Sequence, residues 1–338
     1  SFPRLHTGSA SHSRKTVQES LPNSRNSRKR ESTLHLCTDK MVKRKTRPSF
    51  DLFSGYNWYV PGISGMFMLL LMFITGAVLG NVITFGMMMI SPELAGTYGM
   101  MISYPVMFIP AMLYAASKSR RNEMFETGYA LDSRNFGPFS NFSIALAVSI
   151  VTLALIFVLD IFTVILPPMP EYLEEVFKNM MDGPLWITLI LVSVFAPFFE
   201  EWLCRGMILR GLLQKMHPAA AICISALFFA VIHMNPWQAI PAFAIGIVLG
   251  YVYYRTGSLK LTMLMHCVNN TVAAVSGHLD RFKDADTFMD IMSTPTYVCM
   301  YILCIAMIAL FFVRMRAIPI PFGQRSGSDV LNADTRTE

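Results

Sequence analysis

Six polar side chains interrupt apolar stretches of this sequence and could together do chemistry: Glu200, Glu201, Arg205, His233, His266 and Asn270. An ionisable group costs about 3 kcal/mol or more to insert into a membrane, so such groups mark candidate functional sites. The set supplies two carboxylates, a guanidinium, two imidazoles and an amide. These six are the predicted site residues.

Two pairs within this set are spaced four residues apart, which places the members of each pair on one helix face. Glu201 precedes Arg205 by four residues, the favourable order for an ion pair along a helix. Glu200 projects about 100° away from Glu201 around the same helix, so it faces a different neighbour. His266 and Asn270 share a face in the same way.

Counting from the predicted turns places the ionisable groups at compatible depths. Glu200 lies sixteen positions before Met216 and His233 seventeen after it. In an antiparallel hairpin both residues therefore lie about 25 Å from that turn. His266 lies eight residues after Ser258, about 12 Å from the next turn. The depths agree if the first hairpin projects about 10 Å further into the cytosol, which its polar sequence RGMILRGLLQKMHP favours.

These groups suit hydrolysis of an amide bond by an activated water molecule. A carboxylate in low-dielectric surroundings can act as a general base on water, and an adjacent histidine can share the proton. A second histidine with an asparagine can stabilise the developing oxyanion. The same two histidines and carboxylate also match a catalytic Zn²⁺ set, so the residues leave metal-free and zinc-dependent hydrolysis open. The sequence contains no HExxH motif.

The elements that position these groups are predicted to cross a membrane. Of 338 residues, 53% are hydrophobic and 15% are charged, against about 25% charged in soluble domains. The expected fold is an all-α, polytopic membrane helix bundle, because apolar runs near 20 residues recur along the chain. The eight predicted helices are 60–90, 97–117, 140–166, 184–213, 218–235, 237–254, 258–277 and 295–314.

The distribution of basic residues predicts that both termini are cytoplasmic. The first 50 residues carry twelve Lys and Arg against three acidic residues. The loops that would be cytoplasmic also carry cations, among them Arg210 and Lys215. A basic, Ser-rich leader suits a disordered tail near anionic lipid rather than a nucleic-acid-binding segment. An alternative interpretation is that residues 1–40 are translated from upstream of the natural start codon, because Met41 begins a plausible N-terminus.

The predicted organisation follows from these elements. It is a basic tail (1–50), N-terminal membrane helices (51–183), a catalytic core (184–277), an external loop with the last membrane helix (278–316), and a cytoplasmic C-terminal tail (317–338). Asp160 stands alone in LIFVLDIFTV. We interpret it as a protonated acid or as one that reaches the external interface.

Three short motifs resemble a known family of membrane proteases. The chain contains Glu200-Glu201-x-x-x-Arg205, then Phe229-x-x-x-His233, then His266-x-x-x-Asn270. This order resembles the CPBP family, the CAAX-protease and bacteriocin-processing group of intramembrane endopeptidases, over about residues 184–277.

The resemblance implies a role for each motif residue. Glu200 would be the general base, assisted by His233, and Glu201 and Arg205 would be a supporting pair. His266 and Asn270 would form the oxyanion site or bind a metal. The implied partners are the lipid bilayer and a membrane-associated or lipid-anchored protein or peptide substrate. The expected location is a bacterial inner membrane.

Two other functions remain open from the sequence. One is a catalytically silent protein of the same fold, acting in bacteriocin self-immunity or as a scaffold. The other is a proton-coupled transporter, which the absence of an internal repeat disfavours.

Overall fold

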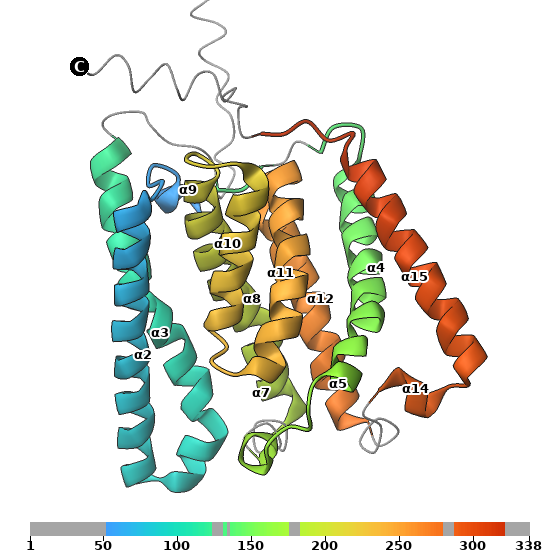
Figure 1. Ribbon diagram of the computed structural model, residues 1–338. Coiled ribbons are helices and arrows are strands. Elements are labelled where there is room, and N and C mark those ends of the chain that lie inside the picture. Colours follow the sequence, from blue (N-terminus) through green and yellow to red (C-terminus); the bar gives the residue numbers. More distant parts are fainter. Residues whose placement is uncertain (1–51, 124–130, 134–135, 176–182, 280–286, 322–338) are drawn as a thin grey trace, which may run out of the picture. The chain divides into compact units, whose positions relative to one another are not determined.

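A computed structural model describes residues 52–123, 131–133, 136–175, 183–279 and 287–321. Within these ranges the regular structure is helical and contains no strand, which confirms the predicted all-α class. The predicted N-terminal tail, residues 1–50, lies outside the described ranges, as do residues 322–338 of the predicted C-terminal tail (317–338). Figure 1 labels the main helices: α2 (Ile63–Ile90), α3 (Pro92–Glu123), α4 (Asn141–Leu159), α5 (Ile161–Ile165), α10 (Pro218–Val231), α11 (Pro236–Thr256), α12 (Leu259–His278), α14 (Phe288–Ile291) and α15 (Thr294–Met315).

One further helical run carries the two adjacent glutamates. It consists of α7 (Leu185–Leu189), η2 (Ile190–Phe195), α8 (Ala196–Glu201), η3 (Trp202–Leu209) and α9 (Arg210–Leu212). In η2 and η3 the backbone is π-helical rather than α-helical.

Every predicted membrane helix has a helical counterpart, but not all are equally suited to cross a bilayer. Six helical runs in the described part are long and apolar enough to do so. Helix α10 has only 14 residues, and α12 carries the polar residues of the predicted site. The chain is therefore an integral, multi-pass membrane protein, while the count of eight crossings and the cytoplasmic orientation of both termini stay predictions.

Helix α12 contacts many of the helices that position the site. It packs against α4, α7, η2, α8, η3 and α11. Helices α10 and α11 form a hairpin that also packs against η3, and α3 contacts η2. Helices α2 and α3 pack against each other, as do α4 and α15 (Figure 1).

Glycines let the backbones of α2 and α3 approach closely. A Cβ atom placed on Gly76 would lie 2.1 Å from the backbone oxygen of Met107. A Cβ atom on Gly80 would lie 2.9 Å from the backbone oxygen of Ser103. Small residues of this kind are typical of helix contacts within membranes, where close backbone approach replaces the hydrophobic effect. The contact fixes α3 at the level of Ser103 and Met107.

Helix α10 is shorter than predicted, so the sequence-based placement of His233 within a helix is wrong. The predicted range 218–235 ends at Val231 in the structure, and His233 lies in the turn that follows. Met234 adopts a φ of 55°, which an α-helix excludes. Asn235 is extended because it caps α11 and precedes Pro236, and a residue before proline disfavours helical geometry.

Arg210 is buried rather than exposed in a cytoplasmic loop. Its Nη2 donates to the backbone oxygen of Tyr56 at 3.1 Å and also to that of Tyr59. The guanidinium thereby attaches the segment before α2 to α9.

Asp160 caps the C-terminal end of α4 and is hydrogen-bonded to another helix. Its Oδ2 accepts a hydrogen bond from the backbone N–H of Phe288 at 3.1 Å. The carboxyl therefore connects the end of α4 to the start of α14, and it takes no part in the candidate site.

Candidate active site

The two glutamates lie on a short α-helical segment between two π-helical ones. In η2 the backbone N–H of Ala196 donates to the carbonyl of Leu191, five residues back. In η3 the backbone N–H of Arg210 likewise donates to the carbonyl of Arg205. π-Helical turns are rare and occur frequently at functional sites, because they change the direction of the side chains that follow.

A proline explains one contact of Asn270 with this irregular run. In the π register Pro197 would donate to the carbonyl of Val192, five residues back, but proline has no N–H. Asn270 Nδ2 donates to that Val192 oxygen at 2.7 Å instead. Its Oδ1 accepts from Asn269 Nδ2 at 3.0 Å. One N–H of the Asn270 amide is thus used to hold η2, and its oxyanion role stays a prediction that would use the second N–H.

Glu201 and Arg205 form a buried ion pair, and both side chains are 0% exposed. Arg205 Nη1 donates to Glu201 Oε1 at 2.7 Å, and Nη2 donates to the backbone oxygen of Gly246 at 3.0 Å. The guanidinium carbon also lies 4.4 Å from the centroid of the Phe229 ring. These contacts use the fixed fork of donors and the flat face of the guanidinium, which a lysine lacks.

The ion pair also determines the orientation of His266. His266 Nδ1 lies 3.0 Å from Glu201 Oε1. Because a carboxylate paired with arginine is ionised and only accepts hydrogen bonds, we assign the ring proton to Nδ1. In the neutral ring Nε2 then carries a lone pair, and this atom lies 3.9 Å from Glu200 Oε2.

The two carboxylate oxygens of Glu200 have different surroundings. The residue is only 9% exposed. Its Oε1 accepts a hydrogen bond from the hydroxyl of Tyr104. Its Oε2 is buried and makes no hydrogen bond with any described residue, and it faces His266 Nε2. A buried carboxylate oxygen without a hydrogen-bond partner beside a basic imidazole nitrogen is suited to take a proton from water.

Tyr104 was missed by the sequence analysis. It lies on α3, 96 positions before Glu200 and outside the stretch that resembles the protease family. Its local sequence, GMMISYPVMF, contains one hydroxyl-bearing ring beside a proline and gives no spacing signal for a site. Only the packing of α3 against the irregular helical run identifies it.

His233 lies beside the other site residues, but the described part of the chain shows no hydrogen bond or ion pair between it and Glu200. Its ring centroid lies 5.1 Å from that of Phe229, which lies 5.4 Å from that of His266. His233 Nδ1 lies 2.8 Å from the backbone oxygen of Phe229. Since a carbonyl only accepts, Nδ1 donates and Nε2 stays available. Among the described residues, His233 makes neither a hydrogen bond nor an ion pair with Glu200, so its assistance to that base stays a prediction.

The residues do not fit the alternative zinc site in their present arrangement. A zinc centre would need Glu200, His233 and His266 around one ion. Across the described ranges no three His, Cys, Asp or Glu side chains gather into a group that could hold a metal. His266 and Glu201 are instead engaged with each other. We derive no step through a metal.

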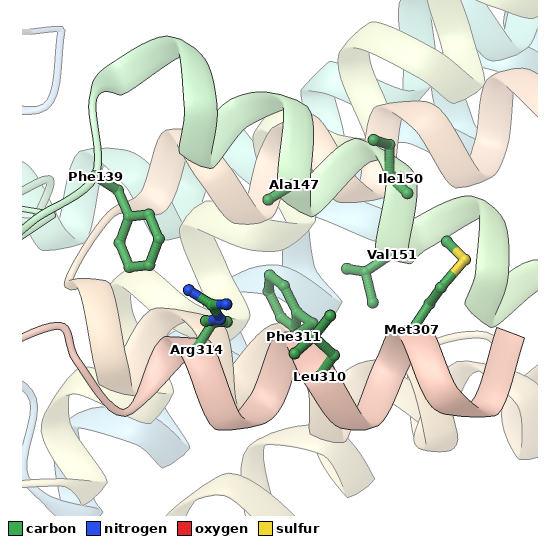
Figure 2. Close-up of a pocket in the computed structure, with 8 residues that line it drawn as sticks. All are labelled: Phe139, Ala147, Ile150, Val151, Met307, Leu310, Phe311 and Arg314. Atoms are coloured by element: carbon green, nitrogen blue, oxygen red, sulfur yellow. The ribbon is translucent and has the colours of Figure 1, made fainter. Parts of the chain in front are cut away.

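An apolar groove between α4 and α15 is separate from these residues (Figure 2). Its volume is about 350 Å³. It is lined by Phe139, Ala147, Ile150, Val151, Met307, Leu310, Phe311 and Arg314. None of the candidate site residues lines it, so the groove is not the place of the chemistry considered above.

Comparison with known proteins identifies the same segment that the motifs mark. Residues 182–272 match the family model described as "Type II CAAX prenyl endopeptidase Rce1-like". The matched stretch contains all six predicted site residues. The resemblance to the CAAX-protease group is therefore confirmed for this segment. No curated protein and no solved structure matches the chain.

Proposed function

We propose that this chain is an intramembrane endopeptidase in which Glu200 activates water for attack on a peptide bond. The observation that carries the proposal is the pair of facing atoms Glu200 Oε2 and His266 Nε2, which lie 3.9 Å apart. This separation is too long for a hydrogen bond and short enough for one water molecule to bridge. The match of residues 182–272 to a peptidase family supports the same reaction class.

The proposed reaction needs no covalent intermediate. Water attacks the scissile carbonyl carbon while Glu200 Oε2 takes its proton, and His266 Nε2 orients the water. The carbonyl oxygen becomes an oxyanion, for which the second N–H of Asn270 is the candidate donor. When the C–N bond breaks, Glu200 passes the proton to the leaving amine nitrogen. Glu201 and Arg205 hold His266 in the tautomer that this sequence of steps requires.

The substrate is proposed to be a membrane-associated protein or peptide, with a prenylated C-terminus as the first candidate. The wording of the matched family, a prenyl endopeptidase, supports this choice. The proposed location is a bacterial inner membrane with the site in its cytoplasmic half. The resemblance to the protease family supports the bacterial inner membrane. The distribution of Lys and Arg supports the cytoplasmic half of that membrane.

Glu200→Gln tests the proposal. The variant keeps the size of the side chain and the acceptor for Tyr104 but removes the base. We expect cleavage of a prenylated and an unprenylated peptide library by purified protein in proteoliposomes to fall by about 10²- to 10⁴-fold. The matched control is Glu93→Gln, an exposed glutamate in the first turn of α3, which should cleave like wild type.

Two outcomes would contradict the proposal. Equal activity of Glu200→Gln and wild type would remove Glu200 from the reaction. A wild-type protein that cleaves no peptide in either library would favour the catalytically silent alternative.

A further inference from the structure

We infer that Tyr104 is a positioning residue for Glu200, so the α2–α3 hairpin is part of the active site as well as a membrane anchor. The inference rests on the proposed function. It concerns a residue outside the segment that matches the peptidase family, because Tyr104 lies on α3 and the match covers residues 182–272.

The hydroxyl of Tyr104 gives the two oxygens of Glu200 different roles. It donates to Oε1, while Oε2 faces His266 Nε2. A carboxylate bound at one oxygen cannot rotate freely, so the unbound oxygen keeps its direction. Without the hydroxyl, both oxygens of a nearly buried carboxylate would lack a donor among the described residues, and such a group reorients or takes up a proton.

Aromatic packing holds the Tyr104 ring in place. Its centroid lies 5.6 Å from that of Phe108. Phe108 in turn stacks on Phe199, with centroids 5.1 Å apart and ring planes 18° apart. Phe199 directly precedes Glu200 in the chain. The same aromatic contact therefore sets the position of both the donor and the acceptor of this hydrogen bond.

The backbone of α3 is fixed at the level of Tyr104. Ser103 and Met107, one position before and three after it, are the residues that α2 approaches through Gly80 and Gly76. Pro105 follows Tyr104 and removes one backbone hydrogen bond of α3. Helix α3 thus depends on α2 at this level, which supports a role for the whole hairpin in placing the hydroxyl.

Tyr104→Phe tests the inference, and Tyr297→Phe is the matched control. Tyr297 on α15 is also buried, and its hydroxyl has no hydrogen-bond partner in the described part of the chain. We expect Tyr104→Phe to lower kcat by about 10- to 100-fold, because hydrogen bonds to charged groups are of that strength. KM should not change, since Tyr104 contacts the base and not the substrate. The control should keep both constants.

The split between kcat and KM, together with stability, separates positioning from a general structural role. A misplaced base lowers kcat alone, whereas a general structural loss also lowers the midpoint of unfolding or changes KM. A fall in kcat that comes with a lower midpoint of unfolding or a changed KM would overturn the inference. Equal kinetics of Tyr104→Phe and Tyr297→Phe would also overturn it.

Infrared spectroscopy keeps the inference testable if the wild type cleaves nothing and the proposed function fails. The carboxylate bands of Glu200 are assigned by their loss in Glu200→Gln, and their frequency should shift in Tyr104→Phe because Oε1 loses its hydrogen bond. Unchanged bands would refute the hydrogen bond. If Tyr104→Phe does not yield folded protein, 3,5-difluorotyrosine at position 104 replaces it. The more acidic hydroxyl donates a stronger hydrogen bond, so the carboxylate bands of Glu200 should shift in frequency, and unchanged bands would contradict the inference.

Discussion

Replacing Arg205 by methionine should destabilise the protein more than any exposed charge change. The guanidinium and the Glu201 carboxylate are both fully buried and 2.7 Å apart. Arg205→Met leaves a buried carboxylate without its counter-charge, and removing one partner of such a pair costs about 3–5 kcal/mol. The variant also loses the contact with the backbone oxygen of Gly246 and the packing on Phe229. We expect a loss of free energy of unfolding at the upper end of that range.

A double variant separates the structural role of the pair from its chemical role. In Glu201→Met/Arg205→Met neither charge is buried alone, so most of the lost stability should return, as for other buried pairs replaced by apolar residues. Activity should not return, because His266 Nδ1 then has no carboxylate to accept its proton. The double variant should therefore be more stable than Arg205→Met and still cleave at least about 10²-fold more slowly than wild type.

The measurements are equilibrium unfolding in mixed micelles and cleavage of the peptide that the wild type cleaves best. The control is Lys260→Met. Lys260 lies 2.8 Å from Asp132, but its side chain is 49% exposed. Asp132 also accepts from Ser258 Oγ and from a backbone N–H. That change should cost no more than about 1 kcal/mol. If Arg205→Met loses no more free energy of unfolding than Lys260→Met, the argument about burial is refuted. Full activity of the double variant would refute the assigned role of Glu201.

Two further predictions concern the α2–α3 contact and the metal question. Gly76→Ala should lower both stability and kcat, because its Cβ would lie 2.1 Å from the backbone oxygen of Met107 and must displace α3. The control is Gly86→Ala, which has open space around it and should be neutral or slightly stabilising. Stability is measured by thermal unfolding. Treatment with a chelator should leave the cleavage rate unchanged, because no described residues gather into a three-ligand metal group; loss of activity that Zn²⁺ restores would contradict metal-free hydrolysis.

The contacts that follow from local spacing could be predicted from the sequence. Glu201 and Arg205 meet as expected, although η3 is π-helical, because residues four apart remain neighbours on either kind of helix. The separation of Glu200 from that pair also follows from spacing alone, since consecutive helical residues point in different directions.

Contacts that depend on counting along regular helices could not be predicted. The estimate that His233 comes level with Glu200 assumed two uninterrupted α-helices. The actual path includes two π-helical segments and a turn that begins after Val231. Each irregularity shifts the rise and the rotation of everything that follows it. The contact of Tyr104 with Glu200 joins helices 96 positions apart and has no local signal.

The structure suggests why two adjacent acids can do different work in one site. Glu201 binds both Arg205 and His266 through its Oε1, and Arg205 is held in turn by the backbone of α11. In the part of the chain that the structure describes, Glu200 is hydrogen-bonded at one oxygen, by Tyr104 of α3. His266 connects them, because one ring nitrogen binds Glu201 while the other faces the unbound oxygen of Glu200. Exchanging the two roles would require Arg205 to move one position along the helix, so the spacing of Arg205 selects which glutamate becomes the base.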